Sequence, residues 1–493
     1  MEVVSKRFSE LEDMMGKRGR VAEITKDEKA AQRDSDTPRT QQETHPAAYF
    51  QRGNACARFW DWIGAPCHAS PRSHLMPRRS FGFTLLLVVL PFYLSGASPA
   101  PAPGRLVIVG GALAADNDAV HAAFLAAADA AGAERPIYIV PAASGYPSES
   151  AGNFRQQLLR RGADAARVRI LPLALMDDPT TPELDESTWA QNGADSDLAA
   201  EAATAGAFWF VGGDQSRIAA VLLAADGADL PVLRALRAAH ARGAALGGTS
   251  AGAAIMSDPM ILGGDSLGAL RLGVSRAYAG MDDQESGPLV LGRGLGFFPF
   301  GLVDQHFDRK ARHARLIVAL AGSPLHRGYG IDEDTALVVD LATGTAEVAG
   351  RANVTFFDTS DASFSVHPAP FAARDIRLSV LSPGDRLDLR QGIVTPSTNR
   401  QPTAGRESFN LPSPVLGAAL VPYSLFRDLA GPWLVDNRAA DTASALAFAP
   451  SGEGWRLVLQ KNSDTAGYEG GGHLTVINAR LSLEPVTVTV TAR

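Results

Sequence analysis

The stretch Leu246–Asp258 reads LGGTSAGAAIMSD and places a single serine, Ser250, among Gly, Ala and Thr residues. Gly248 and Gly252 flank this serine in the pattern G-x-S-x-G. The pattern is typical of a strand that turns sharply into a helix, because a Cβ at either glycine would collide with the chain. The serine then lies at a helix N-terminus, where backbone N–H groups stabilise a developing negative charge. The same small residues also suit a tightly packed helix start without chemistry, so the rest of the sequence has to decide.

The residues before this stretch predict a parallel sheet. Short apolar runs end at the glycine pairs Gly110-Gly111, Gly212-Gly213 and Gly247-Gly248, and a further strand is predicted at 137–140. Helix-like segments separate these runs. Strands that are apolar along their whole length are typical of a parallel sheet covered by helices on both faces. Since ligands bind beyond the carboxyl ends of such strands, we expect the glycine turns to gather at one edge.

The composition narrows the classes of function. The chain has 493 residues, enough for two or three domains, and a net charge of −7. Nucleic-acid binding normally needs a basic face, so we expect no nucleic-acid partner. The two cysteines, Cys56 and Cys67, lie near the N-terminus, which excludes thiolate or Cys-based zinc chemistry downstream. The spacing H-E-x-x-H is absent, and we expect neither a metal nor a cofactor.

The N-terminal residues differ from the rest. Residues 1–75 are polar and are expected to be disordered, or to be an upstream extension from a wrongly chosen start codon. From Met76 the chain has two arginines, an apolar run, and then small residues and prolines. This order is typical of a secretory signal peptide, which we assign to residues 76–102; an uncleaved anchor is the alternative. The sequence therefore predicts export to the periplasm or beyond, without a stable membrane partner.

The C-terminal part has a different pattern. After about residue 340 apolar and polar residues alternate, and the chain ends in the strand-like VTVTV. We therefore divide the exported part into an α/β domain at 103–355 and a β-rich C-terminal extension at 356–493, to which the sequence assigns no role.

A serine nucleophile needs a base and an orienting carboxylate. Among the ten histidines, His306 is the best candidate base, because it follows an apolar segment and precedes a basic, helix-like run at 309–315. His240 and His313 are expected at the surface.

The candidate acids come from two places. The segment GIDEDTALVV offers Asp332, Glu333 and Asp334 in a loop that leads into a strand. Asp265, in LGGDS, is the alternative acid.

Four motifs occur in an order that resembles the cyanophycinases, the serine peptidase family that also contains aspartyl dipeptidase. They read FVGGDQSRI, GGTSAGAAIMSD, GRGLGFFPFGLVDQHF followed by RKARHARL, and GIDEDTALVV. The resemblance runs from about residue 105 to about residue 350. It implies a three-layer α/β fold with a parallel, glutaminase-like sheet (class I glutamine amidotransferase-like) and, commonly, a homodimer.

The resemblance also implies roles for single residues. The triad would be Ser250, His306 and Glu333, with Asp265 as the alternative acid. The oxyanion hole would use the backbone N–H of Ala251 with one from Gly212 or Gly213. The substrate pocket would be lined by Gln215, Asp304, Gln305, Lys310, Arg312 and Arg315.

The implied substrate is cyanophycin, a polyaspartate whose side-chain carboxyls carry arginines, cleaved to β-Asp-Arg dipeptides. Arg312 and Arg315, three apart on one helix face, would clamp a carboxylate, and Asp304 would receive a guanidinium. Two features depart from the family. Lys310 stands where the family has arginine and lacks its planar fork, and the segment between Asp265 and Gly292 has an insertion-like length. Other aspartyl or isoaspartyl peptides are therefore an alternative substrate.

Three further readings compete with a serine peptidase. An α/β-hydrolase esterase also uses G-x-S-x-G, but its acid precedes its histidine, an order that only Asp265 would restore. A non-catalytic binding protein on the same scaffold would be marked by loss of a triad residue, and all three are present. The basic run could also be a solvated helix face.

Overall fold

The computed structural model describes residues 102–275, 277–366, 369–417, 419–420, 426–489 and 491. They belong to one of the two units into which the chain divides, residues 95–493. The upstream extension predicted at 1–75 and the signal peptide predicted at 76–102 lie outside the described residues, apart from Ala102. Within the described part, no helix combines the length and the apolar character needed to cross a membrane.

The predicted parallel strands form one half of a nine-stranded sheet, whose order is β17-β16-β12-β11-β1-β5-β4-β2-β3. The parallel strands are β1 (Leu106–Val109), β5 (Ala245–Thr249), β4 (Ala207–Phe210), β2 (Ile137–Val140) and β3 (Val168–Ile170). In β1, Leu106 and Ile108 belong to one apolar cluster, whereas Val107 and Val109 belong to another. Both faces of the strand are therefore buried, as its unbroken apolar sequence predicts.

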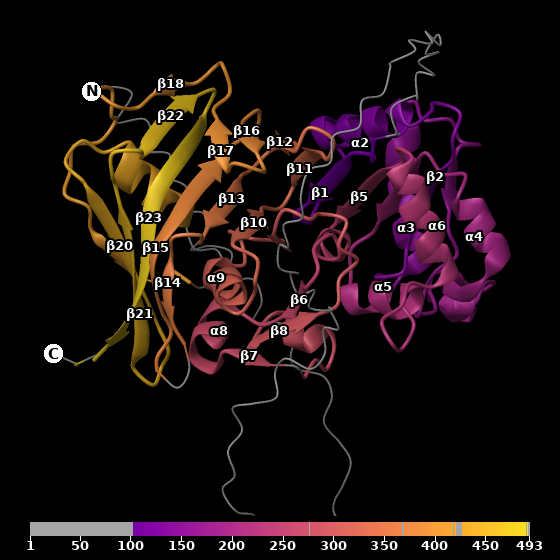
Figure 1. Cartoon of the computed structure of the whole chain (residues 1–493), viewed down its shortest axis with the longest axis horizontal. Coiled ribbons are helices and arrows are strands. Elements are labelled where there is room, and N and C mark those ends of the chain that lie inside the picture. Colours follow the sequence, from indigo (N-terminus) through magenta and orange to yellow (C-terminus); the bar gives the residue numbers. More distant parts are fainter. Residues whose placement is uncertain are drawn as a thin grey trace, which may run out of the picture. The chain divides into compact units, whose positions relative to one another are not determined.

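Helices supply the apolar residues on both faces of this half (Figure 1). They are α2 (Asp118–Ala130), α3 (Pro147–Leu159), α4 (Ser196–Ala202), α5 (Gln215–Leu222) and α6 (Pro231–Ala241), with the 3-10 helix η2 (Glu186–Ala194). Phe124 of α2 packs in the cluster of Val109, and Leu236 of α6 packs in the cluster of Ile108. The fold is therefore α/β.

The prediction of a purely parallel sheet is wrong for the other half. Four strands continue the sheet beyond β1: β11 (Thr335–Asp340), β12 (Thr345–Gly350), β16 (Arg386–Asp388) and β17 (Ile393–Thr395). Each pairs antiparallel with its neighbour, starting with β11 on β1. Short turns join β11 to β12 and β16 to β17. Such a turn reverses the direction of the chain and makes the two strands antiparallel, whereas two parallel strands need a long crossover connection between them.

A second sheet has eleven strands and lies in the orange and yellow part of Figure 1. Its strands are β9 (Leu302–Asp304), β10 (Arg327–Ile331), β13 (Val354–Asp358), β14 (Ser363–Ser365), β15 (Ala372–Leu381), β18 (Gln401–Pro402), β19 (Val415–Gly417), β20 (Thr442–Phe448), β21 (Glu453–Gln460), β22 (Ala466–Gly470) and β23 (His473–Thr487). Helix α10 (Phe426–Ala430) and the π-helical turn η4 (Gly431–Val435) precede β20.

The C-terminal residues are thus not an appended extension. The expected boundary at residue 355 falls inside β13, and β9 and β10 from before it share the second sheet with β13 and β15. Conversely, β16 and β17 from after it complete the first sheet. The two parts are joined through shared sheets, because their strands pair with one another.

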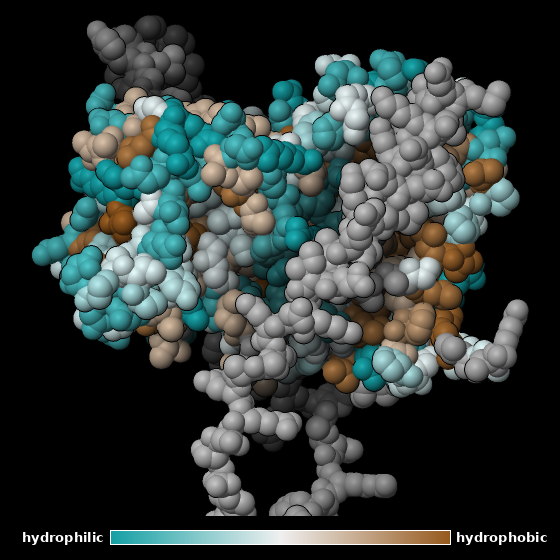
Figure 2. Space-filling model, turned by 180° about the vertical axis from the view of Figure 1, so that it is seen from behind, coloured by the Kyte–Doolittle hydropathy of each residue, from teal (hydrophilic) through white to brown (hydrophobic). Residues whose placement is uncertain are grey.

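The remaining elements are a three-stranded sheet, three helices and a 3-10 turn. A three-stranded sheet contains β6 (Met260–Gly263), β7 (Val274–Ser275) and β8 (Leu289–Gly292). The helices are α7 (Ala251–Ala254), α8 (Ser266–Leu272) and α9 (His313–Ala321), with the 3-10 turn η3 (Met281–Gln284). Apolar residues of α9 pack with those of β15 in one buried cluster. In Figure 2, hydrophilic residues predominate on the left of the coloured surface, and hydrophobic residues gather at the lower right.

Candidate active site

Ser250 lies in the turn between β5 and α7, in a strained conformation with φ of +54°. A Cβ added to Gly248 would lie 2.4 Å from the carbonyl oxygen of Gly252. A Cβ added to Gly252 would lie 2.4 Å from the carbonyl oxygen of Phe210. The steric reading of G-x-S-x-G is therefore confirmed, since both flanking positions lack room for a side chain. Backbone strain of this kind gathers at functional sites.

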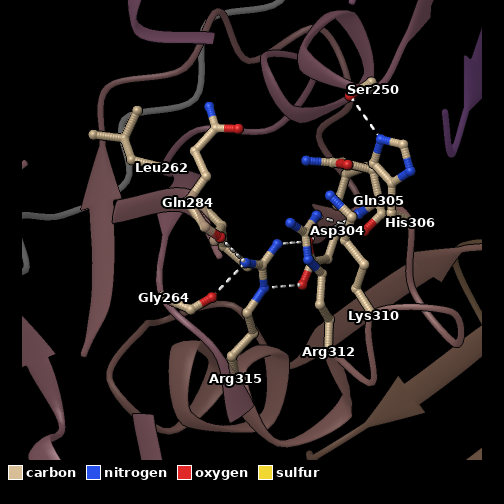
Figure 3. A network of polar contacts seen from close by, with 12 residues as sticks. Ser250, Leu262, Gly264, Gln284, Asp304, Gln305, His306, Lys310, Arg312 and Arg315 are labelled. Carbon is tan, nitrogen blue, oxygen red and sulfur yellow. Dashed lines mark hydrogen bonds and ion pairs between the residues drawn. The ribbon is translucent and has the colours of Figure 1, made fainter. Parts of the chain in front are cut away.

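A hydrogen-bonded chain links Ser250 to His306 and Glu333. The Nε2 atom of His306 lies 2.9 Å from Ser250 Oγ (Figure 3), and its Nδ1 atom lies 2.7 Å from Glu333 Oε1. His306 follows β9 with φ of +48°, and Glu333 lies between β10 and β11. If Nδ1–H donates to the carboxylate, Nε2 is free to accept the serine proton. The structure thus brings together three side chains that are far apart in the sequence.

The environment of His306 favours its neutral form. Burial is the main cause that lowers its pKa, from 6.5 to about 4. The positive charges of Lys310 and Arg312 lower it further, while the hydrogen bond to Glu333 acts in the opposite direction. The imidazole is therefore uncharged at neutral pH, which is the form that accepts a proton.

The neighbouring acids have other partners. Asp332 accepts the backbone N–H groups of Asp308 and Asn353, and Asp334 accepts the N–H of Ala114 at 2.9 Å. Asp265, the alternative acid, caps α8 by accepting the N–H of Gly268 at 2.8 Å, and it also accepts the N–H of Gly287 at 2.8 Å. The structure therefore places Glu333 at the histidine and does not place Asp265 there.

Two of the three residues predicted for an oxyanion hole, Ala251 and Gly212, lie next to the serine. Ala251 is the first residue of α7, directly after Ser250. A Cβ on Gly212 would lie 3.3 Å from the Cβ of Ser250, so this backbone approaches the serine closely. Gly213 has φ of +139°, and a Cβ there would lie 2.1 Å from the carbonyl oxygen of Ala143. What their N–H groups bind stays a prediction.

Two of the residues expected to bind substrate instead bind each other. Arg315 Nε lies 2.8 Å from Asp304 Oδ2, and its Nη2 lies 2.5 Å from Oδ1, in a bidentate pair that is almost fully buried. The guanidinium also donates to the carbonyl oxygens of Gly264 and Gln284 (Figure 3). The expectation that Asp304 receives a substrate guanidinium while Arg315 clamps a carboxylate is therefore wrong for this structure, because each group already has its partner.

Gln215 and Gln305 also lie beside this network. The side chain of Gln215 is buried and donates to the carbonyl oxygens of Ile261 and Leu262, so it holds β6 in place. The backbone oxygen of Gln305 accepts a hydrogen bond from Arg312. Among the described residues, however, the buried Oε1 of Gln305 and the buried Oγ1 of Thr249 have no hydrogen-bond partner. Buried polar atoms are normally paired with protein, water or ligand, so these two are available to bind water or a polar group of a ligand.

The basic run starts before the helix. Helix α9 begins at His313, so Arg312 is its N-cap residue, and its side chain lies beside that of Arg315 (Figure 3). Arg312 is buried and lies 3.3 Å from Glu285 Oε1 through Nη2, while Lys310 Nζ lies 2.5 Å from the same oxygen. Burial lowers the pKa of Arg312 to about 9. The reading of a solvated basic face is therefore wrong for Arg312 and Arg315.

Comparisons with known proteins agree with the motifs. The chain is 32% identical over 272 residues to a cyanophycinase of Nostoc sp., which covers 54% of this chain and 78% of that protein. The chain belongs to the cyanophycinase family. Cyanophycinases of Trichormus variabilis and Synechococcus elongatus are each 33% identical, over 78% and 72% of their lengths and over 54% and 53% of this chain. The resemblance inferred from the four motifs is confirmed.

The chain was also compared with family models and with solved structures. No family model matches the chain. A crystal structure of a peptidase from an acI-B1 actinobacterium aligns with 52% of this chain and 91% of its own, at 22% identity and a TM-score of 0.38.

Family motifs and composition did not reveal every residue of this cyanophycinase-family site. Gly111 adjoins the ring of His306, and its sequence signal was the glycine pair at the end of β1, which predicted only a turn. Arg309 lies 3.0 Å from Glu333 Oε2 through Nη1. Glu285, which contacts Lys310 and Arg312, lies in the segment of insertion-like length, where the family motifs give no signal.

The two histidines expected at the surface are buried. His240 lies in α6, where its Nδ1 atom bonds to the carbonyl oxygen of Ala244 at 2.8 Å. His313 stacks on Phe426 with ring centroids 4.0 Å apart. Burial lowers the pKa of both histidines, and that of His313 to about 3. The C-terminal strand-rich part, which supplies Phe426, could not be foreseen as the cover of α9.

Proposed function

We propose that this protein is a serine peptidase that hydrolyses cyanophycin to β-Asp-Arg dipeptides. The observation that carries the proposal is the chain from Ser250 Oγ through His306 to Glu333 Oε1, with 2.9 Å and 2.7 Å between its atoms. A nucleophile, a base and an orienting carboxylate in this order are the parts that acyl transfer requires. Membership of the cyanophycinase family supports the choice of substrate.

In the proposed reaction, Ser250 Oγ attacks the carbonyl carbon of the polymer amide while His306 Nε2 takes the hydroxyl proton. Glu333 holds the ring through Nδ1–H and stabilises the imidazolium that forms. The C–N bond then breaks, and the imidazolium gives its proton to the leaving amine. Water hydrolyses the acyl-enzyme by the same route, giving its proton to His306, which returns it to Ser250.

The oxyanion of each tetrahedral intermediate would bind backbone N–H groups beside the serine. Ala251 and one of Gly212 and Gly213 are the proposed donors, supported by the close approach of Gly212 to Ser250. Donors fixed in place before the reaction stabilise such charge without reorganising, and one donor contributes about 10²- to 10³-fold in rate.

The proposed substrate contacts follow from the charges that are available. Because Asp304 and Arg315 neutralise each other, Lys310 and Arg312 are the cations proposed to receive a substrate carboxylate. Thr249 and Gln305 supply polar atoms without partners among the described residues. Short aspartyl or isoaspartyl peptides would use the same contacts and are the alternative substrate.

Three broader features are part of the proposal. We propose export through the apolar segment after Met76, a glutaminase-like arrangement of the α/β core, and a homodimer. The helices on both faces of the parallel strands support the second. The order of charges, apolar residues and small residues in 76–102 supports the first.

The test compares residues 101–493 with the Ser250→Ala variant on cyanophycin granules. Mass spectrometry of the supernatant is expected to show β-Asp-Arg from the first protein and at least about 10⁴-fold less from the second. Circular dichroism checks that both are folded. Equal release from the variant would contradict the nucleophile, and hydrolysis only of simple esters would support the esterase reading instead. Binding without hydrolysis by the unaltered protein would support a non-catalytic role.

A further inference from the structure

Glu285 lies on the two cations that the proposed function assigns to the substrate. We propose that its carboxylate is an internal substitute for a substrate carboxylate, which the substrate must displace from Lys310 and Arg312. The inference rests on the proposed function and adds a specificity-determining residue to it.

The contacts define a carboxylate-binding position. Lys310 Nζ lies 2.5 Å and Arg312 Nη2 lies 3.3 Å from the same atom, Glu285 Oε1. The side chain of Arg312 is only 3% exposed, and a buried cation requires a compensating anion. Its other nitrogen, Nη1, donates to the backbone oxygen of Gln305, next to the proposed base. A carboxylate is therefore the group that these two cations select, and they hold it close to His306.

The ion pairs of Glu285 with Lys310 and Arg312 are of a kind that a substrate carboxylate can replace. The Glu285 side chain is 52% exposed, whereas both partners of the Asp304–Arg315 pair are at most 2% exposed and bind through two oxygens. The Glu285 contact uses one carboxylate oxygen of a half-exposed side chain, and such a contact is weaker than a buried, bidentate, charge-assisted pair. An incoming carboxylate would regain both cations while Glu285 returns to water.

Glu285 lies between two glycines and directly after an anchored glutamine. Gly280 has φ of +113° and Gly287 has φ of +89°, and no atom lies within 4 Å of a Cβ added to either. Glycine adopts such conformations without steric cost. The neighbouring Gln284 is buried and bonds to Gln215, so the segment is anchored beside the exposed glutamate. Displacement therefore requires rotation of one side chain and little backbone change.

The consequence is selectivity. An uncharged substrate group gains nothing from displacing Glu285, because it cannot form ion pairs with Lys310 and Arg312. A substrate carboxylate forms both ion pairs again. Glu285 thus lowers the affinity of carboxylates, which must displace it, and keeps neutral groups, which do not displace it, away from Lys310 and Arg312. The reverse role, in which Glu285 binds a substrate guanidinium, is the rival outcome of the test.

Binding is measured by calorimetry on the Ser250→Ala variant with and without Glu285→Gln. The probes are β-Asp-Arg and the same dipeptide with its carboxyls converted to amides. We expect Glu285→Gln to tighten binding of the carboxylate form about five- to tenfold and to leave the amide form within about twofold. The control is Glu347→Gln, which removes an exposed carboxylate of β12 that pairs with Arg386 of β16, and it should change the binding of neither probe. Unchanged or weaker binding of the carboxylate form would overturn the inference.

A second measurement separates this inference from the proposed function. Lys310 is acetylated with acetic anhydride, and the rate is followed by peptide mass mapping in the presence of succinate, a free dicarboxylate. We expect succinate to protect Lys310 at about five- to tenfold lower concentration in Glu285→Gln than in the unaltered protein. This result without cyanophycin hydrolysis would retain the carboxylate position and reject the proposed function. Hydrolysis with equal protection in both proteins would do the reverse.

Discussion

Gly111 lies directly against the imidazole of His306. A Cβ at Gly111 would lie 2.3 Å from Cε1 and 2.4 Å from Nε2 of the ring. The same turn holds the histidine from its backbone side, since the N–H of His306 donates to the carbonyl oxygen of Gly110 at 2.6 Å. The carbonyl oxygen of Gly111 in turn accepts the N–H of Asp334, next to Glu333. The end of β1 therefore positions both the proposed base and its carboxylate.

Gly111→Ala is expected to reduce kcat/KM by about 10²-fold or more, because the ring must leave its place between Ser250 and Glu333. Steady-state hydrolysis of cyanophycin measures the loss. Gly227→Ala is the control, since Gly227 also has a positive φ, +82°, but no atom lies within 4 Å of its added Cβ. Both variants should lose stability from backbone strain, and only Gly111→Ala should lose activity at temperatures where both are folded. Equal activities would show that the ring is not held by this contact.

The acid limb of kcat/KM is expected near pH 4. The pKa of His306 is lowered from 6.5 to about 4, so the neutral base predominates above that pH and activity falls as the pH drops through it. Lys310→Met removes a positive charge that lowers this pKa, and the limb should move to higher pH. Arg456→Met, an exposed position in β21, is the control for charge. A limb near 6.5 in the unaltered protein would mean that the imidazole is solvated.

The sequence predicted the elements whose signals are local. The apolar runs at β1, β2, β4 and β5 and the steric need for Gly248 and Gly252 follow from neighbouring residues. The partnership of Ser250, His306 and Glu333 came from the family resemblance, and the structure brings these three side chains together.

What the sequence missed depends on contacts between distant segments. A charged residue in a motif does not show whether its partner is the substrate or the protein, so Asp304 and Arg315 were assigned to the substrate. Burial of His313 requires Phe426, which comes from a part of the chain without motifs. Strand pairing across residue 355 is likewise a long-range property, because alternation predicts a strand but not its neighbour.

Arg315→Met is expected to destabilise the protein by about 3–5 kcal/mol, because it leaves the carboxylate of Asp304 buried without a counter-ion. Urea unfolding measures the change. Arg386→Met is the matched control, since its pair with Glu347 is exposed at both ends, and it should cost less than about 1 kcal/mol. Unchanged stability of Arg315→Met together with a raised KM would return Arg315 to the substrate site.

Asp308 is expected to make stability depend on pH. Burial and the negative charge of Asp332 raise its pKa from 3.8 to about 8, and His313 Nε2 lies 3.7 Å from its Oδ1. The folded protein therefore keeps a proton that the unfolded chain releases, so stability is present at low pH and is lost as the pH rises from about 4 to about 8. Asp308→Asn removes the titration while keeping the shape. The variant should match the unaltered protein near pH 4 and exceed its stability at pH 8 by about 5 kcal/mol, the free energy that corresponds to a pKa raised from 3.8 to about 8.

Thermal unfolding between pH 4 and pH 8 measures this difference. Asp361→Asn is the control, because Asp361 is 63% exposed and pairs with Arg377, so its effect should not vary with pH above about 5. A constant difference between Asp308→Asn and the unaltered protein over the whole range would show that Asp308 is ionised in the folded state. The carboxyl group of Asp308 would then be solvated, and the contact of Phe426 with His313 would not exclude water from it.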